Sequence, residues 1–154
     1  MLENQIFLSV EELINFLSYA EDTIDLEINT QIMKMVEGFP AEENMTLHNF
    51  FINDVIKGSQ LAKREFISAI LSHLNDKDIY VDVDDLFEFF EEAFQTTDIA
   101  VNEYIVEREI NHEPVPEQEY AEGKTVKALE YGSEIAKKAA VMTIANHIVL
   151  KLRE

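Results

Sequence analysis

Residues 84–95 read DDLFEFFEEAFQ, and this stretch decides the fold that we expect for the chain. Its apolar residues recur three and four positions apart, which is the spacing of one face of an α-helix. Acidic residues occupy most of the other positions, and Asp84 is a good N-cap because acids suit the positive end of the helix dipole. The buried stripe of this helix is predicted to be Leu86, Phe89, Phe90, Ala93 and Phe94.

The same periodicity predicts helices along most of the remaining sequence. Ser9 and Glu12 form a capping-box pattern at the start of the first helix. Glycine favours helix ends, so Gly58 is expected to separate two helices and Gly132 to kink or divide the last one. The expected helical segments are residues 9–20, 23–37, 46–57, 60–74, 84–95, 99–110 and 124–153, with Thr46 and Asp98 as further caps and a loop over 113–123.

These segments predict an all-α, single-domain helical bundle of about six or seven helices over residues 1–154. Residues 24–28 and 79–83 also alternate between apolar and polar side chains, so one minor two-stranded element is the alternative interpretation there. Residues 99–110 fit either a strand or a helix, and we favour a helix. We find no internal repeat in the sequence.

Charge is the most unusual property of this chain, which has a formal net charge of −19. Residues 1–123 hold six Lys and Arg against 28 Asp and Glu, a net of −22, whereas residues 124–154 hold six against three, a net of +3. Such a charge opposes binding to nucleic acid or to an anionic membrane, and it favours fast encounter with a basic protein. Without a signal-peptide pattern or a long apolar run, the cytoplasm is the default location.

The densest acidic cluster follows the turn at residues 75–78 and continues into the helix at 84–95. Phe87 lies among these carboxylates, off the buried stripe, and aromatic side chains are typical anchors of interfaces. The predicted partner-binding residues are Asp82, Asp85, Phe87, Glu88, Glu91 and Glu92.

Motifs for cofactors and metals fail in their details, so we predict no catalytic residue, no metal site and no cofactor. The acids from Asp76 onward do not match a calcium loop, because Val81 stands where the invariant glycine is needed and Phe87 where the final glutamate is needed. A di-iron bundle needs two Glu-x-x-His pairs, and Glu109 with His112 form one such pair. The absence of cysteine excludes disulfides and thiolate sites.

The predicted function is therefore non-enzymatic binding to a basic protein partner, as an inhibitor, an immunity protein or a nucleic-acid mimic. One alternative is a metal-dependent enzyme that holds Mg²⁺ or Mn²⁺ with clustered carboxylates, which requires those acids to converge. Another is a structural or assembly protein that forms a homodimer through the strip Ile135–Leu152, which requires that strip to be exposed.

Overall fold

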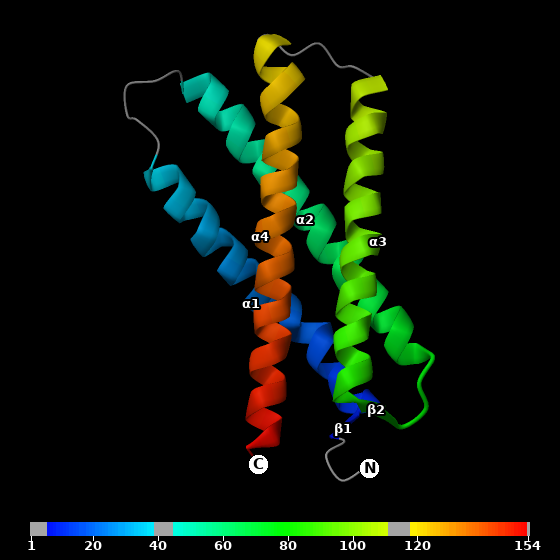
Figure 1. The fold of residues 1–154 in the computed structure, drawn as a ribbon. Helices are drawn as coiled ribbons and strands as arrows, with labels where there is room; N and C mark the ends of the chain where they lie inside the picture. Colours follow the sequence, from blue (N-terminus) through cyan, green and yellow to red (C-terminus); the bar gives the residue numbers. More distant parts are fainter. Residues whose placement is uncertain (1–5, 39–44, 111–117, 154) are drawn as a thin grey trace.

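The computed structural model describes residues 6–38, 45–110 and 118–153 (Figure 1), and the fold there is mostly helical, as expected. No helix in these three ranges is both long and apolar enough to cross a membrane. The described ranges contain two short strands and four helices: β1 (Phe7–Ser9), α1 (Val10–Glu37), α2 (Met45–Asn75), β2 (Tyr80–Asp82), α3 (Val83–Ile110) and α4 (Gln118–Leu152).

The described ranges hold fewer and longer helices than the six or seven expected, because several predicted segments join. The two helices predicted over 9–20 and 23–37 form the single helix α1, with Ile24 and Ile28 fully buried at helical spacing, so the alternative of a strand over 24–28 is wrong. Asp98, the predicted cap of a sixth helix, lies inside α3.

The predicted breaks at glycine are also wrong, because Gly58 lies inside α2 and Gly132 inside α4. Both glycines are buried where these two helices cross. A Cβ on Gly132 would lie 2.8 Å from the amide nitrogen of Ser59 and closer still to the carbonyl oxygen of Val55. The two backbones can therefore approach this closely only where a side chain is missing. This tertiary contact outweighs the weak local preference of glycine against helix.

The helix α4 also begins earlier than the sequence predicted. It starts at Gln118, so residues 118–123 of the expected loop are helical. The rest of that loop, residues 113–117, lies outside the described residues, and so does the side chain of His112.

The two strands pair in an antiparallel ribbon with Leu8 opposite Val81. The alternation at 79–83 thus does mark a strand, but its partner is β1 and not residues 24–28. Each strand runs directly into a helix. The amide of Val10 donates to the carbonyl of Ile79 at 2.9 Å, and the amide of Val83 donates to the carbonyl of Ile6 at 2.9 Å.

Side chains cap both helices that follow the ribbon. The Ser9 hydroxyl accepts a hydrogen bond from the amide of Glu12 at 3.3 Å, which confirms the predicted cap of α1. At α3 the capping side chain is Asp82, whose carboxylate accepts from the amide of Asp84 at 3.1 Å. The predicted cap Asp84 lies two positions too far along the chain.

The chain is an internal duplication, which corrects the expectation of no repeat. The order of elements is β-α-α followed by β-α-α. Residues 6–13, IFLSVEEL, correspond to residues 79–86, IYVDVDDL, at a spacing of 73. Residues 58–74, GSQLAKREFISAILSHL, correspond to 132–148, GSEIAKKAAVMTIANHI, at a spacing of 74. We call residues 6–78 the first unit and 79–152 the second unit, and residues that correspond in this way counterparts.

The contacts of the two units are reciprocal, as a pseudo-two-fold relation requires. Leu8 and Val81 are counterparts, and they face each other in the ribbon. A Cβ on Gly58 would meet the backbone of Leu129, whereas a Cβ on Gly132 would meet the backbone of Val55, the counterpart of Leu129. The pseudo-two-fold axis therefore passes through the ribbon and the crossing of α2 with α4.

Ion pairs and ring contacts obey the same relation. The ammonium of Lys63 lies 2.9 Å from a carboxylate oxygen of Asp25, and that of Lys137 lies 2.8 Å from one of Asp98. Lys77 lies 3.4 Å from Asp85, and their counterparts Lys151 and Glu12 lie 3.5 Å apart. In the third such set, His147 stacks on Phe16 and His73 on Phe89, with ring centroids 3.9 and 4.8 Å apart.

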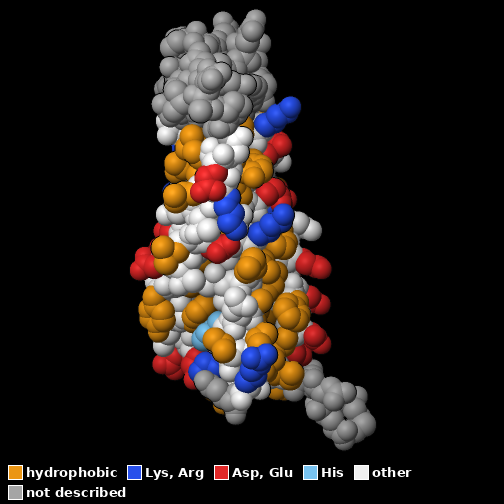
Figure 2. All heavy atoms as spheres, turned by 90° about the vertical axis from the view of Figure 1, so that its left-hand side faces the viewer, with side chains coloured by type: hydrophobic (Ala, Val, Ile, Leu, Met, Phe, Trp, Pro, Cys, Tyr) orange, Lys and Arg blue, Asp and Glu red, His pale blue; other side chains and the backbone are white. Residues whose placement is uncertain are grey.

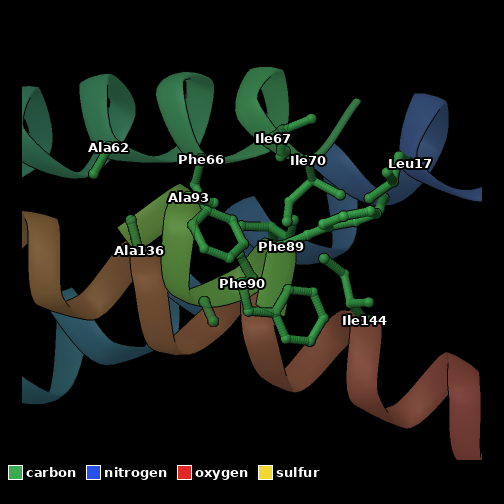
Figure 3. Packing of buried hydrophobic residues seen from close by; sticks show 14 of the residues in the cluster. Leu17, Ala62, Phe66, Ile67, Ile70, Phe89, Phe90, Ala93, Ala136 and Ile144 are labelled. Atoms are coloured by element: carbon green, nitrogen blue, oxygen red, sulfur yellow. The ribbon is translucent and has the colours of Figure 1, made fainter. Parts of the chain in front are cut away.

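The core fills the space between the helices, and Figure 3 shows its centre. Phe66 from α2 is fully buried and packs at 5.2 Å from the ring of Phe94 and 6.2 Å from that of Phe90, both on α3. Ala62 and Ala136 lie along the helices on either side of these rings (Figure 3). The predicted stripe of the Phe-rich segment thus faces the core.

Candidate functional site

The predicted partner-binding residues lie together at the start of α3, and their side chains point away from the core. Asp82 belongs to the outward face of the ribbon, and the others follow within the first three turns of α3. Phe87 is 49% exposed although it follows the buried Leu86, which confirms its predicted place off the buried stripe. Its ring centroid lies 5.9 Å from that of Phe90, so the edge of the core supports its inner side.

Two of the predicted acids contact side chains from the end of α2 and from the turn that follows it. A carboxylate oxygen of Glu92 lies 2.8 Å from Nε2 of His73, whose ring stacks on Phe89. Asp85 pairs with Lys77, whose ammonium also lies 5.7 Å from the centroid of the Phe89 ring. Both carboxylates stay about half exposed, at 58% for Glu92 and 44% for Asp85. These contacts fix the corner between α2 and α3 and leave the acids accessible.

Glu88 and Glu91 differ from that pair, because they are exposed and make no ion pair with the described residues. They stand three positions apart on one face of α3, so their charges repel each other. Any cation that approaches from outside reduces this repulsion. Of the predicted glutamates, Glu88 and Glu91 therefore keep the least compensated charge among the described residues.

Three exposed apolar residues of the ribbon end were missed by the sequence reasoning: Phe7 at 56%, Ile79 at 61% and Tyr80 at 63%. Phe7 lies directly opposite Asp82 in the ribbon, so an aromatic ring adjoins the acidic cluster. The available signal was the repeated pattern of aromatic, aliphatic and capping residue at the start of each unit. We call this combined surface the acid–aromatic end: Phe7, Ile79, Tyr80, Asp82, Asp84, Asp85, Phe87, Glu88, Glu91 and Glu92.

The duplication supplies an internal comparison for these acids. The counterparts of Glu88, Glu91 and Glu92 are Asn15, Ser18 and Tyr19, which are equally exposed on α1. The same backbone therefore carries neutral side chains in the first unit and glutamates in the second. Folding does not require negative charge at these positions, and the acidity of α3 calls for another cause.

The carboxylates do not converge as a metal-dependent enzyme would need. No group of three or more His, Asp or Glu side chains among the described residues could hold a metal ion. The acids of α3 spread over its outer face, which is the arrangement expected of a docking surface.

Lys137, which faces the middle of α3 from α4, is a buried cation. Its ammonium lies 2.8 Å from Asp98 and 2.7 Å from Glu134, and 5.6 Å from the centroid of the Phe94 ring. Burial is the largest single influence on its pKa and lowers it, but the hydrogen bonds and charges of Asp98 and Glu134 together outweigh burial and raise the pKa. This group is a structural ion pair, and its counterpart is the pair of Lys63 with Asp25.

The strip Ile135–Leu152, predicted as a dimer surface, is only partly exposed. Its members Ile135, Ala139, Ile144 and Ile148 are buried in the core of the same chain. The exposed apolar members are Met142, Val149, Leu150 and Leu152. His147, within this strip, packs against Phe16.

Comparisons with known proteins give no match: no protein-family model, curated protein or solved structure is similar to this chain.

Proposed function

We propose that this chain is a non-enzymatic binding protein whose acid–aromatic end docks on a basic protein. Its partner is a nucleic-acid-binding protein, and the chain inhibits it by covering the surface that would otherwise bind phosphates. The observation that carries this proposal is the internal comparison. Exposed neutral residues of the first unit are replaced by Glu88, Glu91 and Glu92 in the second, on the same backbone.

Charge and aromatic side chains have different roles in such a complex. Exposed carboxylates steer a basic partner and raise its association rate, and salt weakens this effect. Phe87, Tyr80 and Phe7 are rigid apolar groups beside the acids, and rings of this kind contribute most to affinity when a partner buries them. The acid–aromatic end provides both contributions on one surface.

The test is an affinity capture from an extract of the source organism with three forms of the protein. The site variant carries Glu88→Asn and Glu91→Ser, which are the counterpart residues and therefore suit the backbone. The control variant carries Glu21→Gln and Asp22→Asn, an equal change of charge at exposed positions of α1. We expect a basic protein to be captured by the wild type and by the control, to be released by salt, and to be lost from the site variant.

The association and dissociation rates of the complex are then measured with the purified partner. We expect the site variant to lower the association rate by about tenfold at low salt. Phe87→Ala should mainly accelerate dissociation, because it removes a buried anchor. Equal capture by the site variant and the control variant would show that the acids of α3 are not the docking surface.

A further inference from the structure

A second face of the molecule is apolar, and it lies where α1 crosses α4. Figure 2 looks at this side of the molecule and shows hydrophobic side chains gathered over its lower half, with Lys and Arg among them and acids mostly along the edges. We call it the α1–α4 face, and its exposed apolar residues are Tyr19, Leu26 and Met33 from α1 and Met142, Val149 and Leu150 from α4.

This face contains a groove of about 370 Å³ between the two helices. Its walls include Leu26 from α1 and both Met142 and Leu150 from α4. Phe16, stacked on His147, also lines the groove. The groove therefore presents apolar side chains from both helices among polar ones, which are Thr23, Glu27 and Thr30 from α1 and Thr143, Asn146 and His147 from α4.

The apolar residues follow a spacing that suits packing against another helix. Tyr19, Leu26 and Met33 are seven positions apart, and so are Met142 and Val149. A repeat of seven residues keeps side chains in one line along a helix, which is the arrangement of a helix–helix seam. The buried stripe of α1 is a different line, so α1 has a second seam that no other described helix covers.

The internal duplication shows that the fold does not need most of these apolar side chains. The counterparts of Leu26 and Met33 are Ile99 and Val106, which are also apolar and exposed. The counterparts of Tyr19, Met142, Val149 and Leu150 are polar and exposed, and in that order they are Glu92, Ser68, Asn75 and Asp76. An apolar surface that the backbone does not require is typical of an interaction site.

Charge distinguishes between the possible arrangements of a second copy on this surface. The α1 helix has seven acids and one lysine, a net of −6, whereas α4 has four acids and five lysines, a net of +1, and Lys137 and Lys151 already pair with acids of the same chain. Two copies of α1 would repel each other, whereas α1 of one molecule against α4 of another avoids this repulsion. We propose that the α1–α4 face binds a second copy of this chain, with α1 of each copy packed on α4 of the other.

This pairing defines the symmetry of the dimer. The two-fold axis runs along the groove, in the plane of the interface. A rotation about this axis places α1 opposite the partner's α4. It does not shift residues along the groove, so residues at the same height in one copy face each other across the interface. Leu26 lines the same stretch of groove as Met142 and Leu150, so it faces the partner's Met142 and the partner's Leu150. The acid–aromatic end belongs to the start of α3 and stays outside this interface.

The first test is the mass in solution, measured by sedimentation and light scattering over a wide range of protein concentration. The wild type should have twice the chain mass of 17.8 kDa. Leu26→Asp should dissociate the dimer, whereas Ile99→Asp, the same change at the exposed counterpart on α3, should leave it intact. Circular dichroism checks that both variants stay folded. A wild type that is monomeric at every concentration, or a Leu26→Asp variant as dimeric as the Ile99→Asp variant, overturns the proposal.

The second test determines which helices pair. The chain has no cysteine, so single cysteines can be introduced at chosen positions. A mixture of the variants Leu26→Cys and Met142→Cys should form a disulfide-linked dimer under mild oxidation much faster than either variant alone. Faster linkage of Leu26→Cys with itself would place α1 against the partner's α1 and overturn the proposed arrangement. Neither test depends on the basic partner, so a failure here leaves the proposed function intact.

Discussion

Replacing Gly132 by alanine tests the close crossing of α2 and α4. In an ordinary helix this change stabilises by about 1 kcal/mol, because alanine loses less backbone entropy. Here the added Cβ would lie 2.8 Å from the amide nitrogen of Ser59 and 2.9 Å from the carbonyl carbon of Val55, and these are backbone atoms that no rotamer change can move. These two contacts alone require the helices to separate by about 0.5 Å, and the carbonyl oxygen of Val55 would lie closer still, so the loss of packing energy is at least that of a 0.5 Å gap.

The cost of that separation can be worked out from contacts. A buried side chain makes about 50 atom contacts of about 0.15 kcal/mol, and we take about half of them to cross the interface. A gap of this size removes about a quarter of the attraction, which is roughly 1 kcal/mol for each side chain. For Val55, Ser59 and Leu129 together the loss is about 3 kcal/mol, and the helix propensity of alanine reduces the net destabilisation to about 2 kcal/mol.

Urea denaturation at one protein concentration measures this difference. With a slope of about 2 kcal/mol per molar urea, the midpoint of Gly132→Ala should fall by about 1 M. The matched control is Gly38→Ala, because Gly38 has a φ of −80° and a Cβ there meets only the carbonyl oxygen of Met35, at 3.4 Å. That variant should be as stable as the wild type or slightly more so. A Gly132→Ala protein with an unchanged or raised midpoint would refute the reasoning about the crossing.

Two further predictions concern side chains. In urea denaturation, Phe66→Ala should lower the free energy of unfolding by about 3–5 kcal/mol, because it leaves a cavity beside Phe94. Phe87→Ala should change this free energy by less than about 0.5 kcal/mol. Similar losses for both variants would contradict the assigned burial of the two side chains. Lys137→Met should lower the free energy of unfolding by about 1 kcal/mol at neutral pH. Lys138→Met, at an exposed position, should lower it by less. The pKa of Lys137 is raised in the native state, so its contribution to the free energy of unfolding is complete below the unfolded pKa of about 10.4. This contribution is lost as the pH rises through the native pKa. The difference in free energy of unfolding between wild type and Lys137→Met should therefore narrow only in strong alkali.

Much of the local structure could be predicted from the sequence. The buried stripe of α3 and the Ser9 cap follow from spacing and residue type, which act within one or two turns. The glycine positions could not be predicted in this way, because the contact that makes Gly58 favourable lies on another helix 71 residues along the chain, at Leu129. Local propensity describes the cost of a glycine, and only the packed structure describes its benefit.

The duplication was visible in the sequence but hidden by its chemistry. Few residues recur unchanged, and the spacing differs by one residue between the start of a unit and its last helix. What recurs is the class of side chain, such as Ser9 and Asp82 as caps, or Phe7 and Tyr80 as exposed rings.

The candidate sites were predictable to different degrees. The acids of the acid–aromatic end were found from charge density alone. Phe7 was missed, because only strand pairing brings it beside Asp82. Of the α1–α4 face, only the α4 part was predicted. The line of exposed apolar residues on α1 could be recognised only once the structure showed that the other apolar line of this helix is buried.

The two-unit architecture also implies that the order of the units along the chain is interchangeable. The link from the end of α2 to the start of β2 spans only residues 76–79. By the pseudo-two-fold relation, the end of α4 and the start of β1 are separated by a similar gap, and Figure 1 draws both at the same end of the molecule. A circular permutant that is opened at residues 76–79 and closed by a short linker from Arg153 to Ile6 should therefore keep every contact between the units and fold to the same structure.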